Sequence, residues 1–229
     1  MGWLWGSKKQ KSSSSEAALI NTNMDKNKME TTEKTKMENI VETNIEIDIM
    51  PTPNPNALKF ISNKNFKAEG SSTYLCAEDC GENILAKEIF EIRGVDHLHL
   101  FENFITVTKF GYESWDNLQP KILDILNKLL PSHNPNYFDP DPEEERRRNL
   151  PPELKKIEEI LDRTIRPGLQ GDGGDIKALS LENKVLMVRY QGACGTCPSS
   201  ATGTLEAIKA ILREEFDPDL DVFIAPEMY

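Results

Sequence analysis

Residues 184–198, with the sequence KVLMVRYQGACGTCP, decide how the second half of this chain folds. The first seven residues predict a strand, and the stretch that follows them as far as Cys197 predicts a loop. Pro198 predicts the start of a helix, because proline suits the first helical turn. The segment therefore places Cys194 and Cys197 between a strand and a helix.

These two cysteines form a CxxC pair whose chemistry suits a soft metal. The two-residue gap lets both sulfurs converge on one point, and Gly192 and Gly195 permit backbone turns that a β-carbon would hinder. A helix N-terminus lowers the pKa of a nearby thiol, and thiolates select zinc, copper(I) and iron–sulfur clusters over harder cations. A thiol–disulfide oxidoreductase fits less well, because thioredoxin-like sites need a βαβ scaffold and this motif follows a predicted hairpin.

The number of protein ligands distinguishes the remaining metal-binding interpretations of the CxxC pair. A cubane cluster or a structural zinc ion usually takes four protein ligands, and the CxxC pair supplies two. The other two come either from a second copy of the chain or from Cys76 and Cys80, which share a face if residues 74–83 are helical. We interpret Cys76 and Cys80 as incidental thiols, with a reversible disulfide or a second ligand pair as alternatives.

Other polar residues predict structure rather than chemistry. His97, His99 and His133 are not spaced as a metal site, and the first two are expected at an edge or on the surface of a strand. Asp172–Asp175 predicts a sharp helix-to-strand turn, because an EF-hand loop needs Asp or Asn where Gly174 stands. The sequence contains no phosphate-binding loop and no recognisable Ser/His/Asp or Cys/His set.

The 229 residues divide into four predicted segments. Residues 1–46 have few aromatic or branched apolar side chains and predict a disordered tail. The patterns over 47–132 and 151–229 predict two small α/β sandwich domains, so the fold class is α+β. Prolines and charged triplets over 133–150 predict a linker between the domains.

Individual elements can be predicted within these domains. In the first, a tight turn is expected at Glu102–Asn103 and an amphipathic helix at Trp115–Leu130. In the second, a helix should end at Pro167–Gly168. A loop over 170–175 and a hairpin over 176–190 should follow.

Composition excludes several classes of protein. The net charge of -11 at pH 7 opposes binding to phosphate backbones, so no nucleic-acid partner is expected. No window has the roughly 18 consecutive apolar residues of a membrane helix, so no membrane partner is expected either. Mitochondrial presequences are rich in arginine, whereas the first arginine here is Arg93. We therefore expect a cytoplasmic location.

Two blocks of sequence resemble one family, the NifU-like (Nfu-type) iron–sulfur cluster scaffold proteins. The block that resembles their C-terminal domain comprises Leu169–Asp175 and Gly192–Ser200. The block that resembles their N-terminal domain comprises Pro51–Asn56, Leu58–Ile61, Ile92–Val95 and Asn103–Thr108. The resemblance is specific because the two blocks agree independently and in the same order.

The resemblance implies an iron–sulfur cluster scaffold or carrier. By this analogy Cys194 and Cys197 of two chains hold one [4Fe–4S] cluster in a homodimer, and the cluster passes from upstream assembly proteins to recipient apoproteins. Gly192, Gly195 and Pro198 shape the loop. The two-domain arrangement also resembles mitochondrial members of the family, which gives an alternative to the cytoplasm.

Overall fold

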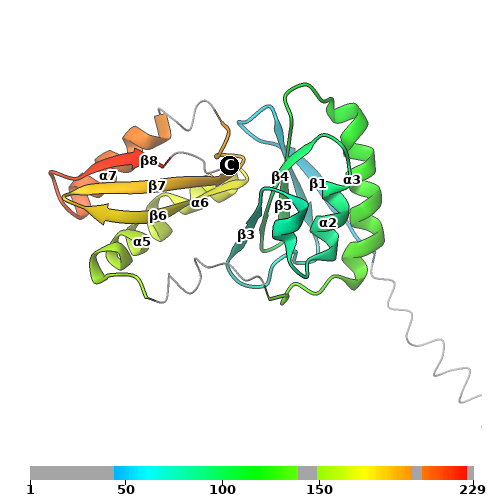
Figure 1. Ribbon diagram of the computed structural model, residues 1–229, viewed down its shortest axis with the longest axis horizontal. Helices are drawn as coiled ribbons and strands as arrows, with labels where there is room; N and C mark the ends of the chain where they lie inside the picture. Colours follow the sequence, from blue (N-terminus) through cyan, green and yellow to red (C-terminus); the bar gives the residue numbers. More distant parts are fainter. Residues whose placement is uncertain (1–43, 139–148, 198–202, 226–229) are drawn as a thin grey trace, which may run out of the picture. The chain divides into compact units, whose positions relative to one another are not determined.

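A computed structural model describes residues 44–138, 149–197 and 203–225 of the chain (Figure 1). Nearly all of the predicted tail, most of the predicted linker and Pro198 lie outside these residues. The described residues form two sheets, each with its own hydrophobic core. The predicted α+β class with two domains is therefore confirmed, while the exact domain boundaries stay a prediction. Among the described residues, no helix is both long and apolar enough to cross a membrane.

The first domain is built on a five-stranded antiparallel sheet in the order β1-β2-β5-β4-β3. Its strands are β1 (Ile47–Pro51), β2 (Ala57–Ser62), β3 (Ser71–Tyr74), β4 (Val95–Phe101) and β5 (Phe104–Lys109). Helices α2 (Ile84–Phe90) and α3 (Trp115–Leu129) contribute to one core with the sheet (Figure 1). The expected turn at Glu102–Asn103 joins β4 to β5, and Glu102 has a φ of 42°. A 3-10 helix, η2 (Leu130–Ser132), continues α3.

Strands β4 and β5 present different side chains on their two faces, because successive residues of a strand point to opposite sides. The face toward the core carries Leu98, Leu100, Ile105 and Val107. The opposite face, which we call the polar face, carries His97, His99, Thr106 and Thr108. All four polar residues are buried, and β4 lies between β5 and β3. The expectation that His97 and His99 lie at an edge or on the surface is therefore wrong.

The segment around Cys76 and Cys80 differs from a continuous helix over 74–83. Strand β3 extends to Tyr74, and the 3-10 helix η1 (Ala77–Cys80) follows after Cys76. The Cys80 side chain is buried in the core of the first domain, and its sulfur donates a long hydrogen bond of 3.6 Å to the Cys76 carbonyl. Cys80 thus packs as a small apolar residue.

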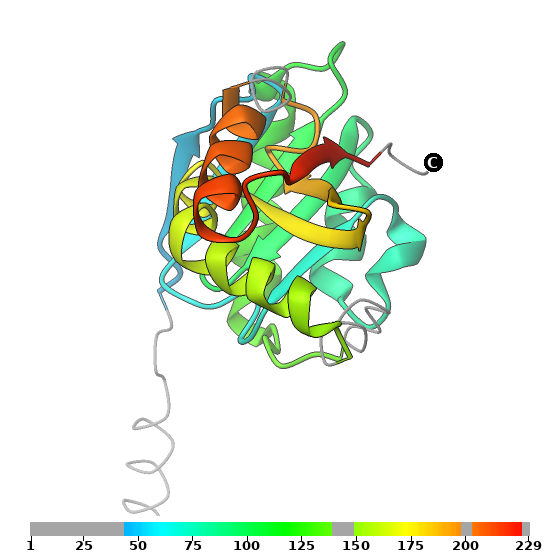
Figure 2. The same ribbon diagram turned by 90° about the vertical axis from the view of Figure 1, so that its left-hand side faces the viewer.

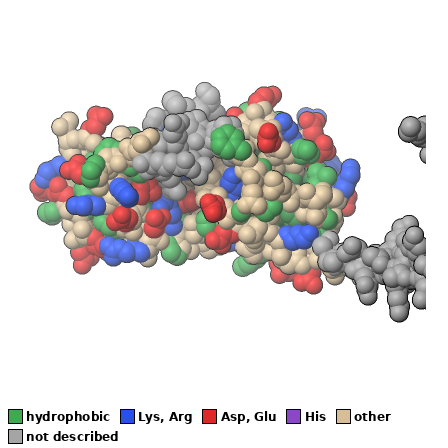
Figure 3. Space-filling model, turned by 90° about the horizontal axis from the view of Figure 1, so that it is seen from below, with side chains coloured by type: hydrophobic (Ala, Val, Ile, Leu, Met, Phe, Trp, Pro, Cys, Tyr) green, Lys and Arg blue, Asp and Glu red, His purple; other side chains and the backbone are tan. Residues whose placement is uncertain are grey.

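The second domain has a three-stranded sheet in the order β6-β7-β8. Strands β6 (Gly174–Glu182) and β7 (Val185–Gly192) form the predicted hairpin, and β8 (Asp221–Ile224) pairs with β7 in parallel. Helices α5 (Pro152–Thr164) and α7 (Leu205–Glu215) lie on the same side of this sheet (Figure 2). On the face drawn in Figure 3, acidic and basic side chains are interspersed.

The chain does not leave its helical path at Pro167–Gly168, which corrects the predicted helix end. Helix α5 ends at Thr164, and a short helix α6 (Arg166–Gly171) runs through both residues. Proline is tolerated there because the first turn of a helix has no intrahelical partner for its N–H groups. The predicted loop over 170–175 is therefore shortened to Asp172–Gly173, and Gly173 has a φ of 81°.

A buried ion-pair cluster ties α5 and α6 to β6. The Arg166 guanidinium contacts the carboxylates of Glu158, Asp162 and Asp175, and its Nη2 donates to the Ile176 carbonyl at 2.9 Å. Asp175 Oδ1, 3.1 Å from Arg166 Nε, also accepts from the Ile176 N–H at 2.7 Å. The turn that precedes β6 is thus fixed from inside the domain.

We expect Arg166→Met to lower the free energy of unfolding by about 3–5 kcal/mol, because it leaves the buried carboxylates of Glu158 and Asp175 without their cation. Urea unfolding measures this loss. The matched control is Asp162→Asn, whose side chain is 62% exposed and should change stability by less than ~1 kcal/mol. Equal losses in the two variants would contradict this account of the cluster.

Candidate metal centre

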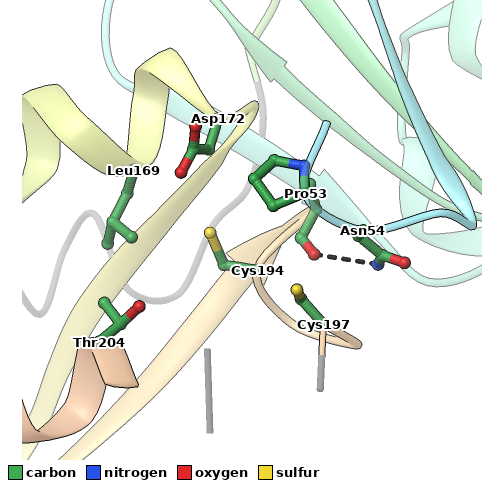
Figure 4. Close-up of a pocket in the computed structure, with 8 residues that line it drawn as sticks. Pro53, Asn54, Leu169, Asp172, Cys194, Cys197 and Thr204 are labelled. Atoms are coloured by element: carbon green, nitrogen blue, oxygen red, sulfur yellow. Dashed lines mark hydrogen bonds between the residues drawn. The ribbon is translucent and has the colours of Figure 1, made fainter. Parts of the chain in front are cut away.

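The CxxC pair lies in a tight loop directly after β7. Gly195 N donates to Gly192 O at 3.1 Å, and Cys197 N donates to Cys194 O at 3.4 Å. These turns bring both cysteines to one pocket, where each is only 5% exposed (Figure 4). The pocket is also lined by Pro53, Asn54, Leu169, Asp172, Ala193 and Thr204. None of the four cysteines is in a disulfide bond among the described residues.

The space for Cys194 depends on two glycines that face each other across the β6–β7 ladder. Gly174 pairs with Gly192, and a β-carbon on Gly174 would lie 2.4 Å from Cys194 Sγ. Gly192 has a φ of 60°, and a β-carbon there would lie 2.6 Å from the Gly173 carbonyl oxygen. The turn predicted at Gly192 therefore requires glycine, whereas Gly195 is not among the described glycines with positive φ.

A loop of the first domain reaches this site, which the sequence did not predict. Asn54 lies between β1 and β2 and is 1% exposed. Its Nδ2 donates to Ala193 O at 3.0 Å (Figure 4). The same Nδ2 donates to Thr196 Oγ1 at 2.9 Å. Its Oδ1 accepts from Asn56 N at 3.0 Å, which holds the side chain in place. Asn54 belongs to a segment that resembles the family, but no local pattern indicates a contact 139 residues away.

Basic residues of the first domain also approach the second. Lys59 Nζ donates to Gln170 O at 2.7 Å, and His97 Nε2 lies 3.4 Å from Gly192 O. His99 is fully buried, and burial lowers its pKa to about 3, with smaller contributions from the positive charges of Lys177, His97 and Lys59. His99 is therefore a neutral imidazole at physiological pH.

The metal-ligating side chains of the described residues do not gather into a larger site around the CxxC pair. Among the described residues, no group of three or more His, Cys, Asp or Glu side chains is placed to hold a metal ion. Cys76 and Cys80 therefore do not complete a four-cysteine site with the CxxC pair in this structure. The predicted helix start at Pro198, which was expected to favour the thiolates, lies outside the described residues.

Gly174→Ala should displace Cys194, because the added methyl group overlaps Sγ and the sheet leaves it no other space. Overpacking of this kind costs about 1–3 kcal/mol, and urea unfolding measures it. Gly171→Ala is the matched control, since a β-carbon there meets nothing within 4 Å. A loss of stability at residue 171 that matches the loss at residue 174 would count against the steric explanation.

Acid should weaken the native state through His99. A base whose pKa is lower in the folded state than in the unfolded state makes its full contribution to stability above the unfolded pKa, near 6.5. This contribution is lost as the pH falls toward the folded pKa of about 3. At pH 5 the loss amounts to roughly 2 kcal/mol. Urea unfolding at pH 7 and pH 5 measures it, and His99→Gln should have a smaller difference between the two. An unchanged difference would contradict the assignment to His99.

Both domains match models of known protein families. Residues 47–133 match the family model described as "Scaffold protein Nfu/NifU N terminal", and residues 157–223 match the model "NifU-like domain". A solution NMR structure of a NifU-like protein from Saccharomyces cerevisiae is 30% identical, with a TM-score of 0.37, over 39% of this chain and 81% of that one.

Two curated relatives extend over both domains. NifU-like protein 5, mitochondrial, from Arabidopsis thaliana is 32% identical over 72% of this chain and 62% of its own length. The human protein named NFU1 iron-sulfur cluster scaffold homolog, mitochondrial, is 32% identical over 73% of this chain and 66% of its own length. The chain thus spans less than two thirds of either relative. With both family models matched in order, the chain belongs to the Nfu/NifU family of scaffold proteins.

Proposed function

We propose that this protein is an iron–sulfur cluster scaffold or carrier, not an enzyme, that holds one [4Fe–4S] cluster between two subunits. The ligands are Cys194 and Cys197 of each chain. The observation that carries the proposal is the CxxC pair in a glycine-shaped loop. Among the described residues, no group of three or more His, Cys, Asp or Glu side chains is placed to hold a metal ion. Two chains then supply the four thiolates that a cubane cluster requires.

The two-ligand arrangement suits transfer better than permanent binding. A recipient thiolate replaces a carrier thiolate on iron, the released carrier thiolate takes up a proton, and the cluster keeps its electrons. Each chain gives up two bonds in this exchange, whereas a closed four-cysteine cage in one chain would give up four. The partners are a second copy of this chain, upstream cluster-assembly proteins and recipient apoproteins.

Two other uses of the same cysteines are less well supported. A thioredoxin-like oxidoreductase needs a βαβ scaffold, but β7, which precedes the motif, pairs with β6 as a hairpin. A structural zinc site would need Cys76 and Cys80 close to the pair, and the described residues contain no such group.

The compartment is inferred from relatives. The names of the two curated relatives above include the word mitochondrial, and they give no support to the expected cytoplasmic location. We therefore adopt the mitochondrial alternative as part of the proposal.

Protein purified without air should contain about two iron and two sulfide ions per chain in a dimer, which is half of a [4Fe–4S] cluster for each subunit. Cys194→Ser and Cys197→Ser should each remove the iron and sulfide and leave the fold intact, because sulfur is the preferred ligand atom. Iron and acid-labile sulfide analysis with measurement of the oligomeric mass tests this.

The matched control is Cys76→Ser, which should retain wild-type iron because this residue is not in the pocket. Full iron in Cys194→Ser would overturn the assignment of ligands. One zinc ion per monomer without sulfide would overturn the proposed function itself.

A further inference from the structure

The CxxC loop lies against a surface of the first domain that is rich in polar groups, with Pro53 and Phe104 beside them. Asn54 Nδ2 donates to two oxygen atoms of the loop. A β-carbon on Gly192 would lie 2.9 Å from His99 Cγ, and one on Gly173 would lie 2.8 Å from Thr106 Oγ1. The backbone of the second domain thus approaches the polar face at Gly173 and Gly192.

Burial of the polar face is incompletely compensated by hydrogen bonds. His99 Nε2, Thr106 Oγ1 and Thr108 Oγ1 are buried without a hydrogen-bond partner among the described residues. The same is true of Gln191 Oε1 on β7, beside Gly192. Groups of this kind are normally paired in a permanent interior, because leaving one unpaired costs free energy. Separation of the two domains would return all four atoms to water.

The contact also lacks a shared apolar core. Most buried apolar residues form two separate clusters, one in each domain, with no member in common. Ala57, Phe104, Ala193 and Cys197 are buried outside both clusters. The Lys59 ammonium is partly buried between the Phe104 ring, 3.9 Å from its centroid, and the Gln170 carbonyl. Burial lowers the pKa of Lys59, against a smaller opposing effect of Asp172, so this amine loses hydration in the contact. Contacts between domains that are polar in this way usually permit relative motion.

We propose that Asn54, Lys59 and the polar face form a docking surface for the chain's own CxxC loop, and that the loop must separate from this surface before a cluster bridges two chains. The inference rests on the proposed function for its consequence, but not for the docking itself. In the closed form both cysteines are 5% exposed, and Asn54 binds Ala193 and Thr196, which lie directly before each cysteine. Opening breaks no covalent bond.

Closure and cluster binding then compete for the same loop. When only a fraction of the molecules is open, the apparent affinity for a ligand falls by that fraction. A variant that weakens docking should therefore expose the cysteines and load a cluster faster, and both effects should have a similar size. This parallel change separates a docking surface from a merely structural contact.

The test variant is Asn54→Asp, which keeps the oxygen that accepts from Asn56 N but places a carboxylate against Ala193 O. Lys59→Met is an independent second variant, which removes the bond to Gln170 O and keeps an apolar stem over Phe104. The control is Asn63→Ala, an exposed residue whose Oδ1 accepts from Glu46 N at the far end of the β1–β2 pair.

The first measurement is the rate at which N-ethylmaleimide modifies Cys194 and Cys197 in metal-free protein, followed by mass spectrometry of the peptides. We expect about a tenfold faster reaction in Asn54→Asp, the ratio that corresponds to ~1.4 kcal/mol, and a several-fold increase in Lys59→Met. Asn63→Ala should react at the wild-type rate. Unchanged rates in both test variants would overturn the docking surface, and if Asn54→Asp does not fold, Lys59→Met decides alone.

The second measurement is the rate of anaerobic cluster loading from ferrous iron and sulfide. We expect it to rise in the same variants and by a similar factor. Faster modification with unchanged loading would overturn the claim that docking limits cluster binding. If no variant, wild type included, takes up a cluster, the proposed function fails, while the modification rates still decide whether the loop docks.

Discussion

The pairing of Gly174 with Gly192 at the end of the β6–β7 hairpin is the constraint on which the site depends. Two residues without β-carbons face each other there, and the sulfur of Cys194 takes up the space above Gly174. Ala193 N donates to Gly173 O, so the turn before β6 and the loop after β7 are held together. The position of the cysteines therefore follows from the register of a sheet, and a shift by one residue would turn every side chain of the strand to the other face.

The ion-pair cluster around Arg166 also stabilises this register, through contacts with α5 and with the start of β6. Asp175, directly after Gly174, is held by Arg166, which Glu158 of α5 also contacts. Glu158 in turn accepts from Ala178 N in β6. Helix α5, the turn and the strand are thus connected by buried charges that are paired with one another. Such pairs can contribute little to net stability, and here they connect the elements that place the CxxC loop.

Local patterns predicted much of this structure, and their failures have a common cause. Alternation and helical spacing found β4, β5, α3 and the β6–β7 hairpin because these signals lie within a few residues. The same alternation placed His97 and His99 at an edge or on the surface, since a polar face normally meets water. A contact with the second domain helps to bury them. The role of Asn54 has the same origin, because its partners are more than a hundred residues away. The sequence predicts a helix end at Pro167–Gly168 because glycine and proline are common just after a helix. Proline is also common in the first turn of a helix, and Pro167 lies in the first turn of α6.

A cluster carrier has to satisfy two conditions that oppose each other. Its thiols must be reachable by a second chain and by a recipient, yet accessible thiolates are readily oxidised to sulfenic and higher acids. An apolar cover would protect empty thiols but would resist removal, since each buried apolar area would have to return to water. A polar cover with unpaired atoms, such as the face formed by His99, Thr106 and Thr108, opens at lower cost because those atoms regain hydrogen bonds with water. The incomplete hydrogen bonding of this contact is therefore consistent with a cover that protects the pair while it is empty and is displaced when a cluster binds.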